Sequence, residues 1–358
     1  ATIIVACLGG LLLFPHGFLR SVALGSIATV ALAALNAITI LPAILSILGR
    51  RVDALGLAFM RKTKSSEEIE NGRWGRLTHW VMRNPIKVVV TIVLGLLALT
   101  LPIGNLAFGG INETYLPPDN PTRVAQEQFD ELFPGQRTEP IKLVIENAQG
   151  QNLAAITTQA NNAPGLVEPF SPVGGSRDGI IVFKAGLVDR NDAAPAIEFL
   201  RSIDTPDGTT MQVTGTPAIE RDSIDAMVDR LPLMAVLVVI VVTVLMFLTF
   251  GSLVLPIKAV LMTTLGLGST MGILTWIFID GHGAGWMNFT PGPIMAMILL
   301  LIAAIVFGLS TDYEVFLLSR MVEAREKGPS TSEAIHIGSS HTGRIITAAA
   351  LILIVVTG

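Results

Sequence analysis

The sequence predicts a polytopic α-helical membrane protein that carries an external α/β domain, and three observations lead to this fold class. Of the 358 residues, 51% are hydrophobic and only 15% are charged, whereas a soluble domain carries about 25% charged residues. Apolar runs of the length that crosses a bilayer, about 20 residues, recur along the chain. A polar block of domain size, residues 105–231, interrupts these runs.

By length and hydropathy we expect seven membrane spans, of which the first and the last are incomplete. The second span is expected to break near Pro42, because proline removes a helical hydrogen bond. Since the chain begins and ends within apolar runs, we expect it to be a fragment of a longer protein. The predicted spans are 1–14, 20–48, 86–104, 232–250, 256–279, 294–318 and 342–358.

The distribution of charge orients the spans. Residues 49–87 hold nine Lys or Arg and four acidic residues, whereas residues 105–231 hold nine basic and eighteen acidic residues. Basic residues near the ends of spans favour the cytoplasmic side, so we expect a cytoplasmic basic segment at 49–85 and an external domain at 105–231. The three spans within 232–318 then return the basic loop 319–341 to the cytoplasm, which agrees with the same rule.

The external block is predicted to fold as a mixed α/β domain. A helix is predicted from Asn120 as N-cap and Pro121 at the first position, and its apolar face holds Ala125, Phe129, Leu132 and Phe133. Strands are expected at 141–147, 179–187 and 209–215, with Met211 and Val213 on one side of the last. With a helix at 192–203 and a loop at 147–178, this order predicts a small split β-α-β module. A further helix is expected to run from Pro217 into the span 232–250.

Asp312 lies within the apolar stretch 294–318 and is the strongest functional candidate. An ionised Asp at the centre of a spanning helix costs roughly 2.5–3.5 kcal/mol on insertion scales, and such residues commonly serve in proton relays or ion pathways. We therefore predict that Asp312 and its neighbour Tyr313 load and release a proton. The alternative is a structural hydrogen bond, or a side chain that reaches the cytoplasmic side.

Helical spacing assigns neighbours to Asp312. Ile305, Leu309, Tyr313 and Phe316 lie three or four residues apart on its side of the helix, which is expected to face the interior of the bundle. Glu314 points elsewhere, and we expect it to reach the cytoplasmic interface or to pair with Arg320.

The remaining polar and small residues give weaker signals. Three glycines have the spacing of small residues that let helices pack closely. Close packing is the preferred interpretation, and a role in substrate passage is the alternative. Asp280 and His282 lack a third ligand for a metal and are interpreted as interfacial polarity. His336 and His341 are expected to be solvated, and Cys7 to act as a small apolar residue. The three glycines are Gly266, Gly268 and Gly272.

Several function classes lack their sequence signals. One cysteine excludes a disulfide framework within this chain. The sequence contains no phosphate-binding loop, no dinucleotide-binding glycine pattern and no Gly-x-Ser-x-Gly elbow. We therefore expect neither direct use of ATP nor a cofactor, a metal, an enzymatic activity or a nucleic-acid partner.

Three stretches carry a resemblance to a known family: "FGLSTDYEVFLLSRMVEAREKG", "GGINETYLPPDNPTRVAQEQFDELFPGQRTEP" and "GSTMGILTWIF". They resemble the RND superfamily of proton-driven exporters, and within it the mycobacterial MmpL group, most closely its trehalose monomycolate exporter. The resemblance extends over the whole chain and implies an RND-like helical bundle, a periplasmic porter-like domain and a place in the inner membrane. Two stretches, near 56–61 and 147–178, are shorter than the pattern of this group.

The resemblance also implies functional residues and partners. Members of the group carry two Asp-Tyr pairs on neighbouring helices, and Asp312 and Tyr313 match the second pair. The first pair has no counterpart here and is expected in an N-terminal half. Small-molecule inhibitors of the group bind around these pairs, which implies that Leu309, Phe316 and Ile305 line a central pocket.

The sequence thus predicts a secondary transporter that uses the proton gradient to export a lipid, by resemblance trehalose monomycolate, for the mycolic-acid cell envelope. Membrane lipids are the expected surroundings. Two alternatives stay open: export of another lipid or a siderophore, and a scaffold or lipid sensor without transport. An intramembrane aspartyl hydrolase is disfavoured, because it needs a second carboxylate close by.

Overall fold

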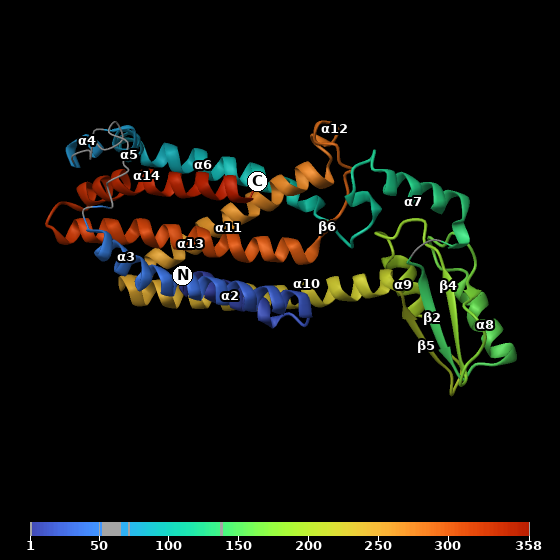
Figure 1. The fold of residues 1–358 in the computed structure, drawn as a ribbon. Coiled ribbons are helices and arrows are strands. Elements are labelled where there is room, and N and C mark those ends of the chain that lie inside the picture. Colours follow the sequence, from blue (N-terminus) through green and yellow to red (C-terminus); the bar gives the residue numbers. More distant parts are fainter. Residues whose placement is uncertain (1, 50, 52–65, 71, 137–138, 358) are drawn as a thin grey trace. The chain divides into compact units, whose positions relative to one another are not determined.

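The structure is a computed structural model that describes residues 2–49, 51, 66–70, 72–136 and 139–357. The chain divides into two compact units, which are described separately. The helical unit comprises Ala1–Leu101, Leu233–Met271 and Leu301–Gly358, and the α/β unit comprises Pro102–Pro232 and Gly272–Leu300. Three long helices contribute residues to both units (Figure 1): α10 (Thr216–Phe250), α11 (Val254–Leu274) and α13 (Ala296–Glu326).

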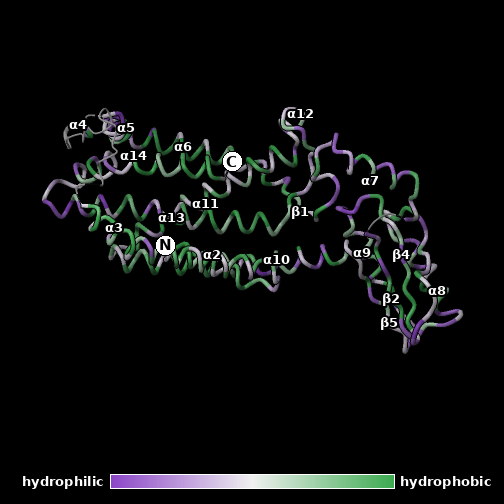
Figure 2. Tube along the Cα trace, in the orientation of Figure 1, coloured by the Kyte–Doolittle hydropathy of each residue, from purple (hydrophilic) through white to green (hydrophobic). Residues whose placement is uncertain are grey.

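Six helical segments among the described residues are long and apolar enough to cross a membrane, and a shorter apolar helix precedes them. Hydrophobic residues follow one another along these helices (Figure 2), and the six long ones correspond to six of the seven predicted spans. The predicted loop 319–341 is largely helical instead, because α13 continues to Glu326 and α14 begins at Thr331. The short apolar segment is Thr2–Leu13. The six candidate spans are Gly17–Leu48, Pro85–Asn105, Thr216–Phe250, Val254–Ile279, Ala296–Glu326 and Thr331–Val356.

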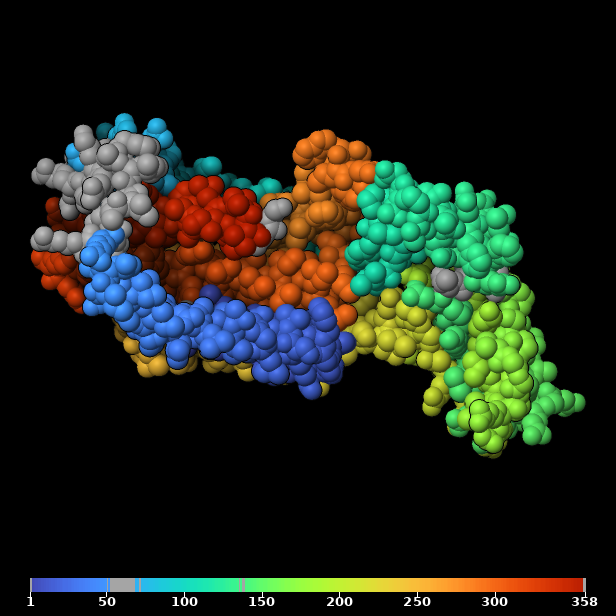
Figure 3. Space-filling view, in the orientation of Figure 1, coloured from blue at the N-terminus to red at the C-terminus, as the bar shows by residue number. Residues whose placement is uncertain are grey.

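The second span breaks where proline chemistry requires it. Helix α2 (Gly17–Ile38) ends before Thr39, and α3 (Ile40–Leu48) follows. The break lies just after Ile38, the residue whose carbonyl oxygen would clash with the ring of Pro42, four positions later. The break predicted near Pro42 is therefore confirmed. Helix α2 lies on the surface of the helical unit (Figure 3), and its large apolar side chains there, such as Leu32 and Ile38, are exposed.

Small residues allow the helices of the helical unit to approach one another. The Oγ of Ser269 in α11 donates to the carbonyl oxygen of Leu96 (2.9 Å) in α6 (Pro85–Thr100). At Gly338 in α14 (Thr331–Thr357), a Cβ atom would lie 3.0 Å from the backbone of Met321 in α13. Ser330 and Glu333 form a capping box at the start of α14, with reciprocal hydrogen bonds of 3.3 Å.

Two helices join the helical unit at the end where α14 begins. They are α4 (Ser66–Glu70) and α5 (Arg73–Arg83). Much of the predicted cytoplasmic segment 49–85, including the shortened stretch near 56–61, lies outside the described residues.

The α/β unit contains a four-stranded antiparallel sheet in the order β3-β4-β2-β5. The odd-numbered residues of β2, Ile141, Leu143 and Ile145, point into a core with residues of both covering helices. The order strand, helix, two strands, helix, strand is the split β-α-β module that the sequence predicts. Its elements are β2 (Ile141–Glu146), α8 (Gly150–Ala160), β3 (Ser171–Pro172), β4 (Ile180–Ala185), α9 (Ala194–Arg201) and β5 (Thr210–Thr214).

One prediction for this unit is wrong: residues 147–178 are not all loop, because they contain helix α8. Its Ile156 and Ala160 are buried in the core. Helix α7 (Pro121–Leu132) begins as expected, since the Oδ1 of Asn120 accepts hydrogen bonds from the backbone N–H groups of Thr122 (3.0 Å) and Arg123 (3.4 Å). Its predicted apolar face is largely exposed at Phe129, Leu132 and Phe133.

The α/β unit also includes residues 272–300, which the sequence divided between the ends of the spans 256–279 and 294–318 and the connection between them. Strand β1 (Phe108–Gly109) pairs in parallel with β6 (Ile294–Met295). The buried guanidinium of Arg123 donates to the Oγ1 of Thr290 (2.7 Å), and the amide of Asn105 donates to the carboxylate of Asp280 (3.0 Å). These bonds tie the segment after α11 to the start of the α/β block.

Candidate functional site

Helix α13 carries the candidate residue Asp312 and contacts three other helices of the helical unit. Gly308 faces α1 (Thr2–Gly10), Glu314 pairs with Lys258 of α11, and Met321 faces Gly338 of α14. Because α13 has other helices on several sides, the residues in its middle have protein neighbours. This position explains how a chain can keep a carboxylate in a long apolar segment.

The contact with α1 lies one helical turn before Asp312. A Cβ atom at Gly308 would lie 3.3 Å from the Cα of Ile4 and 3.4 Å from the Cβ of Cys7. Cys7 is fully buried, as expected for a small apolar residue. The Asp312 carboxylate is close enough to the Cys7 sulfur for an electrostatic interaction, so α1 forms part of the surroundings of this carboxylate.

The predicted interior face of α13 is only partly enclosed. Leu309, Asp312, Tyr313 and Phe316 are half-buried, whereas the Ile305 side chain is 37% exposed. Ile305 is thus the most exposed member of this face, and its place in the interior of the bundle stays a prediction. The guanidinium of Arg320 lies 5.7 Å from the centre of the Phe316 ring, within the range of a cation–π contact.

Glu314 has a different partner from the one expected. Its carboxylate forms an ion pair with Lys258 of α11, and its side chain is 14% exposed. Arg320, the predicted partner, pairs instead with Glu323 (2.7 Å). Arg320 lies six residues after Glu314, on a different side of the helix, which explains why that pairing does not form. The signal that sequence reasoning missed is Lys258 itself, a single cation in the apolar run 256–279.

The glycines of α11 differ in their surroundings. At Gly268 a Cβ atom would lie 3.3 Å from the Thr100 side chain, close to the bond between Ser269 and Leu96. Gly272 is buried. At Gly266, by contrast, a Cβ atom would meet no described atom within 4 Å. A side chain at Gly268 would thus meet α6, whereas the described residues leave open space beside Gly266; close helix packing at the three glycines stays a prediction.

Asp280 and His282 lie beyond a π-helical segment, Thr275–Ile279, at the end of α11. The His282 ring stacks on Trp276 with 4.4 Å between ring centres, and Asp280 accepts a hydrogen bond from Asn105. The part of the chain that the structure describes contains no group of three or more His, Cys, Asp or Glu residues that could hold a metal ion. Asp280 and His282 thus each have a local partner, Asn105 and Trp276.

His336 and His341 are partly buried, whereas the sequence predicted that they would be solvated; the His341 side chain is 34% exposed. The Nε2 of His336 lies 3.1 Å from the carbonyl oxygen of Gly75 in α5, and its ring meets His79 edge-on at 6.3 Å. The Nε2 of His341 lies 3.8 Å from the carboxylate of Glu70 in α4. Each histidine finds its partner on another helix, which spacing along α14 does not reveal.

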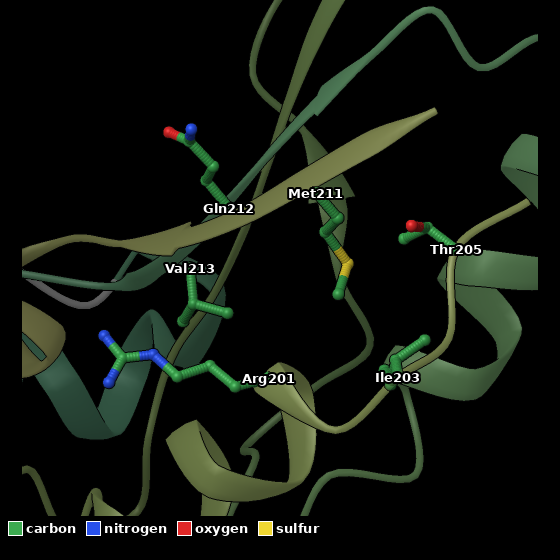
Figure 4. Close-up of a pocket in the computed structure, with 6 residues that line it drawn as sticks. All are labelled: Arg201, Ile203, Thr205, Met211, Gln212 and Val213. Atoms are coloured by element: carbon green, nitrogen blue, oxygen red, sulfur yellow. The ribbon is translucent and has the colours of Figure 1, made fainter. Parts of the chain in front are cut away.

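A groove of about 500 Å³ lies beside the edge strand β5 in the α/β unit (Figure 4). Ile203, Met211 and Val213 give it apolar walls. Arg201 reaches over it, but its guanidinium donates two hydrogen bonds of 2.8 Å to the Asp222 carboxylate. These bonds raise the pKa of Arg201 above its usual range, and the Asp222 carboxylate balances the charge of the guanidinium beside the groove.

Comparison with known proteins places the chain in a family. The family model described as "MMPL family" matches residues 1–88 and 185–358, which is more than half of the chain. The chain belongs to the MMPL family. The matched residues include Asp312 and Tyr313, and α1 and α11, whose residues Cys7 and Lys258 contact α13.

Named relatives of this MMPL chain cover its full length. It is 50% identical over 398 residues to the trehalose monomycolate exporter MmpL3 of Mycolicibacterium smegmatis and 49% identical to MmpL3 of Mycobacterium tuberculosis, with all of this chain aligned. It is 33% identical to membrane protein YdfJ of Bacillus subtilis, with 99% of this chain aligned.

The MMPL chain spans about two fifths of the length of these exporters, 39% of the first and 42% of the second. Their alignments run over 398 residues, more than the 358 of this chain. The relatives therefore carry residues that this chain lacks, which agrees with the shortened stretches predicted from the sequence.

Proposed function

We propose that this chain is the proton-coupled part of a lipid exporter in which Asp312 binds and releases a proton. The names of the relatives support export of trehalose monomycolate. The observation that carries the proposal is Asp312 itself, a half-buried carboxylate in the middle of an apolar 31-residue helix that packs on three neighbours.

A change in the charge of Asp312 affects the helices that pack beside it. Binding a proton removes a negative charge between α1, which approaches at Gly308, and the ion pair of Glu314 with Lys258 on the far side of α13. The packing preferred by α1 and α11 therefore depends on the protonation of Asp312. One charge that crosses a potential of 100 mV supplies about 2.3 kcal/mol, so a few protons supply the energy to move one lipid.

The proposed orientation follows from charge. The basic ends of α5 and α13, with Arg83 and Arg325 in their last turns, are proposed to lie on the cytoplasmic side of the inner membrane, and the acidic block 105–231 on the periplasmic side as a porter-like domain. We further propose that a second Asp-Tyr pair in an N-terminal half completes the proton site.

The same face of α13 is proposed to line a central pocket for small-molecule inhibitors. Leu309 and Phe316 flank Asp312 by one helical turn on either side, and both are half-buried. Ile305 lies at the margin of this face, because its side chain is more exposed.

Proteoliposomes that contain the protein test the proposal, with lipid export measured with and without a pH gradient. Asp312→Asn removes the titratable group at nearly constant size, so we expect export driven by the gradient to fall to background. Asp312→Glu keeps the carboxylate and should retain part of the activity.

The matched control is Glu323→Gln, on the same helix three turns later and nearly on the same side. Glu323 is exposed and pairs with Arg320 and Lys327, so this variant should export normally. Gradient-driven export by Asp312→Asn at the normal rate would refute the proton role and favour the scaffold or lipid-sensor alternative.

A further inference from the structure

Helix α5 presents a basic and aromatic surface that the proposed transport does not use. Its 11 residues lie between Gly72 and Asn84, and they contain three arginines, two tryptophans and no acidic residue. Asn84 has a non-helical backbone conformation (φ −130°, ψ 50°), and Pro85 begins the span α6 directly after it. The helix axis therefore breaks at the point where the chain enters the apolar segment.

One side of α5 packs against α14. A Cβ atom at Gly343 would lie 2.8 Å from the Trp74 ring, so this tryptophan packs closely on α14. Gly75 is buried, and its carbonyl oxygen lies 3.1 Å from His336. These contacts fix the rotation of α5 about its axis.

The opposite side of α5, which we call the outer face, is exposed. Spacing of three, four and seven residues brings its members together on one side of the helix. Trp80 is 57% exposed and Leu77 is 48% exposed. The outer face consists of Arg73, Arg76, Leu77, Trp80 and Arg83.

The charges around the outer face are mainly positive. Lys87 at the start of α6, four residues after Arg83, adds an exposed cation. Glu70 of α4 lies close to His341 of α14, on the side of α5 that is already packed. Figure 2 shows hydrophilic residues gathered at this end of the helical unit.

We propose that the outer face of α5 is a docking surface for the anionic phospholipid headgroups of the bilayer. A helix rich in arginine with Trp and Leu among the cations is the composition of a helix that lies in the membrane interface. Tryptophan is enriched at the level of the headgroups, and each Lys or Arg near an anionic surface contributes about a fivefold gain in binding.

A membrane surface fits this face better than an acidic protein does. The outer face ends at Arg83, two residues before Pro85, the first residue of a span, so the bilayer lies within about one helical turn of Arg83. An acidic peptide would pair with the arginines but would leave the exposed Trp80 and Leu77 in water, whereas the bilayer interface accepts both kinds of side chain.

The test measures which lipid lies next to Trp80. The protein is placed in phosphatidylcholine nanodiscs that contain a small fraction of brominated phosphatidylglycerol or the same fraction of brominated phosphatidylcholine, since bromine quenches tryptophan fluorescence. The difference between the native protein and Trp80→Phe isolates the signal of Trp80 from the other three tryptophans. We expect phosphatidylglycerol to be enriched at Trp80 at least fivefold over phosphatidylcholine, and 0.5 M salt to reduce this enrichment.

Two triple variants complete the test. In Arg73→Gln/Arg76→Gln/Arg83→Gln the enrichment should fall to about one, while Arg73→Lys/Arg76→Lys/Arg83→Lys should keep it. The matched control, Arg320→Gln/Arg325→Gln/Lys327→Gln, removes as many charges from the end of α13 and the residue after it, and should leave the enrichment unchanged. Because the three α5 arginines are exposed, the thermal unfolding of all variants in neutral detergent should match the native protein.

Equal quenching by the two lipids in the native protein would overturn the proposal, and so would an equal loss in the α13 control. A Trp80 that neither lipid quenches would show that the outer face does not lie at the bilayer, and would assign it to an acidic protein instead. The readout does not depend on export, so it stands apart from the proposed proton role of Asp312.

Discussion

At the scale of single residues, Gly308 decides how closely α1 can approach α13 beside Asp312. A side chain there would meet the backbone of Ile4 and the side chain of Cys7. Since both partners belong to a packed helix, they have little room to move. The glycine is therefore required by a contact 300 residues away in sequence.

We predict that Gly308→Leu separates α1 from α13 and exposes Cys7. Overpacking of this kind costs about 1–3 kcal/mol, so the midpoint of thermal unfolding in detergent should fall. Cys7 is the single cysteine and is fully buried, so its rate of alkylation by a maleimide reports the separation directly.

Gly266→Leu is the matched control, because a side chain at that position meets no described atom within 4 Å. Cys7 should stay protected in this variant. Equal alkylation of the Gly308→Leu and native proteins would show that α1 does not pack on α13 at this glycine.

Tyr115 in the α/β unit gives a prediction for alkaline pH. Burial raises the pKa of its phenol, the Met295 backbone acts in the opposite direction and the Glu220 carboxylate raises it further. A raised pKa in the folded state means that the contribution of Tyr115 to stability is complete below the unfolded value, near 10, and is lost as the pH rises through the folded value.

In Tyr115→Phe this loss should disappear, so the unfolding midpoint of the variant should fall less steeply between pH 10 and pH 11 than that of the native protein. The absorbance change of tyrosine ionisation, subtracted between the two proteins, should show Tyr115 titrating above pH 10. A titration of this tyrosine below pH 10 would contradict the burial argument.

The ion pair of Glu314 with Lys258 is a contact that the sequence alone does not predict. The sequence indicates that Asp312 and Glu314 occupy different sides of one helix, because that follows from helical spacing. It does not indicate that Lys258, 56 residues earlier, is the partner, because partner choice depends on which helices become neighbours. The same limit applies to His336 and His341, whose partners lie in α5 and α4.

At the scale of elements, hydropathy predicted the long helices well because about 20 apolar residues are themselves the physical signal. The split β-α-β order followed in the same way from alternating strands. Helix α8 was missed because Asn, Gly and Pro residues surround it, although Leu153, Ile156 and Ala160 have helical spacing. Its short apolar face becomes decisive only when the sheet is present to cover it.

Packing between elements gives a prediction at Gly338. A Cβ atom there would lie 2.7 Å from the Met321 side chain and 3.0 Å from the Met321 backbone. Because the backbone of α13 cannot move aside cheaply, Gly338→Ala should destabilise the helical unit by about 1–3 kcal/mol, measured as a lower midpoint of thermal unfolding.

The control for Gly338→Ala is Gly25→Ala in α2, where a Cβ atom meets no described atom within 4 Å. Alanine is up to about 1 kcal/mol more favourable than glycine inside a helix, so this variant should be as stable as the native protein or more stable. A Gly338→Ala protein that unfolds at the native temperature would show that α13 and α14 do not pack at this point.

At the scale of the whole molecule, the residues that match the MMPL family can be compared with the two compact units. The family match covers 1–88 and 185–358, and the residues between these ranges include β2 and α8, in the middle of the α/β unit. Part of the α/β unit thus lies outside the matched ranges, while almost all of the helical unit lies within them. The sequence predicted both kinds of structure, but it did not assign residues 272–300 to the α/β unit, because β1 and β6 are too short to leave a pattern.

Helix α10 contributes residues to both units, and Pro232 is the last residue of this helix that groups with the α/β unit. A proline inside a helix lacks one hydrogen bond and crowds the carbonyl group four residues before it, here that of Val228. The helix therefore has its weakest internal hydrogen bonding where residues of one unit give way to residues of the other.

We predict that Pro232→Ala strengthens α10 at this junction. Alanine is about 3 kcal/mol more favourable than proline inside a helix, which corresponds to about a hundredfold slower hydrogen exchange of the amides around Val228–Leu233 if local opening of the helix controls exchange. Mass spectrometry of deuterated peptides from this region measures the change.

Pro217→Ala in the same helix is the control. Pro217 lies in the first turn, where its missing N–H group costs no hydrogen bond, so exchange around Pro232 should stay at the native rate. Unchanged exchange in Pro232→Ala would mean that the helix around Pro232 is already held closed by its neighbours, and that the proline is not the point where α10 opens.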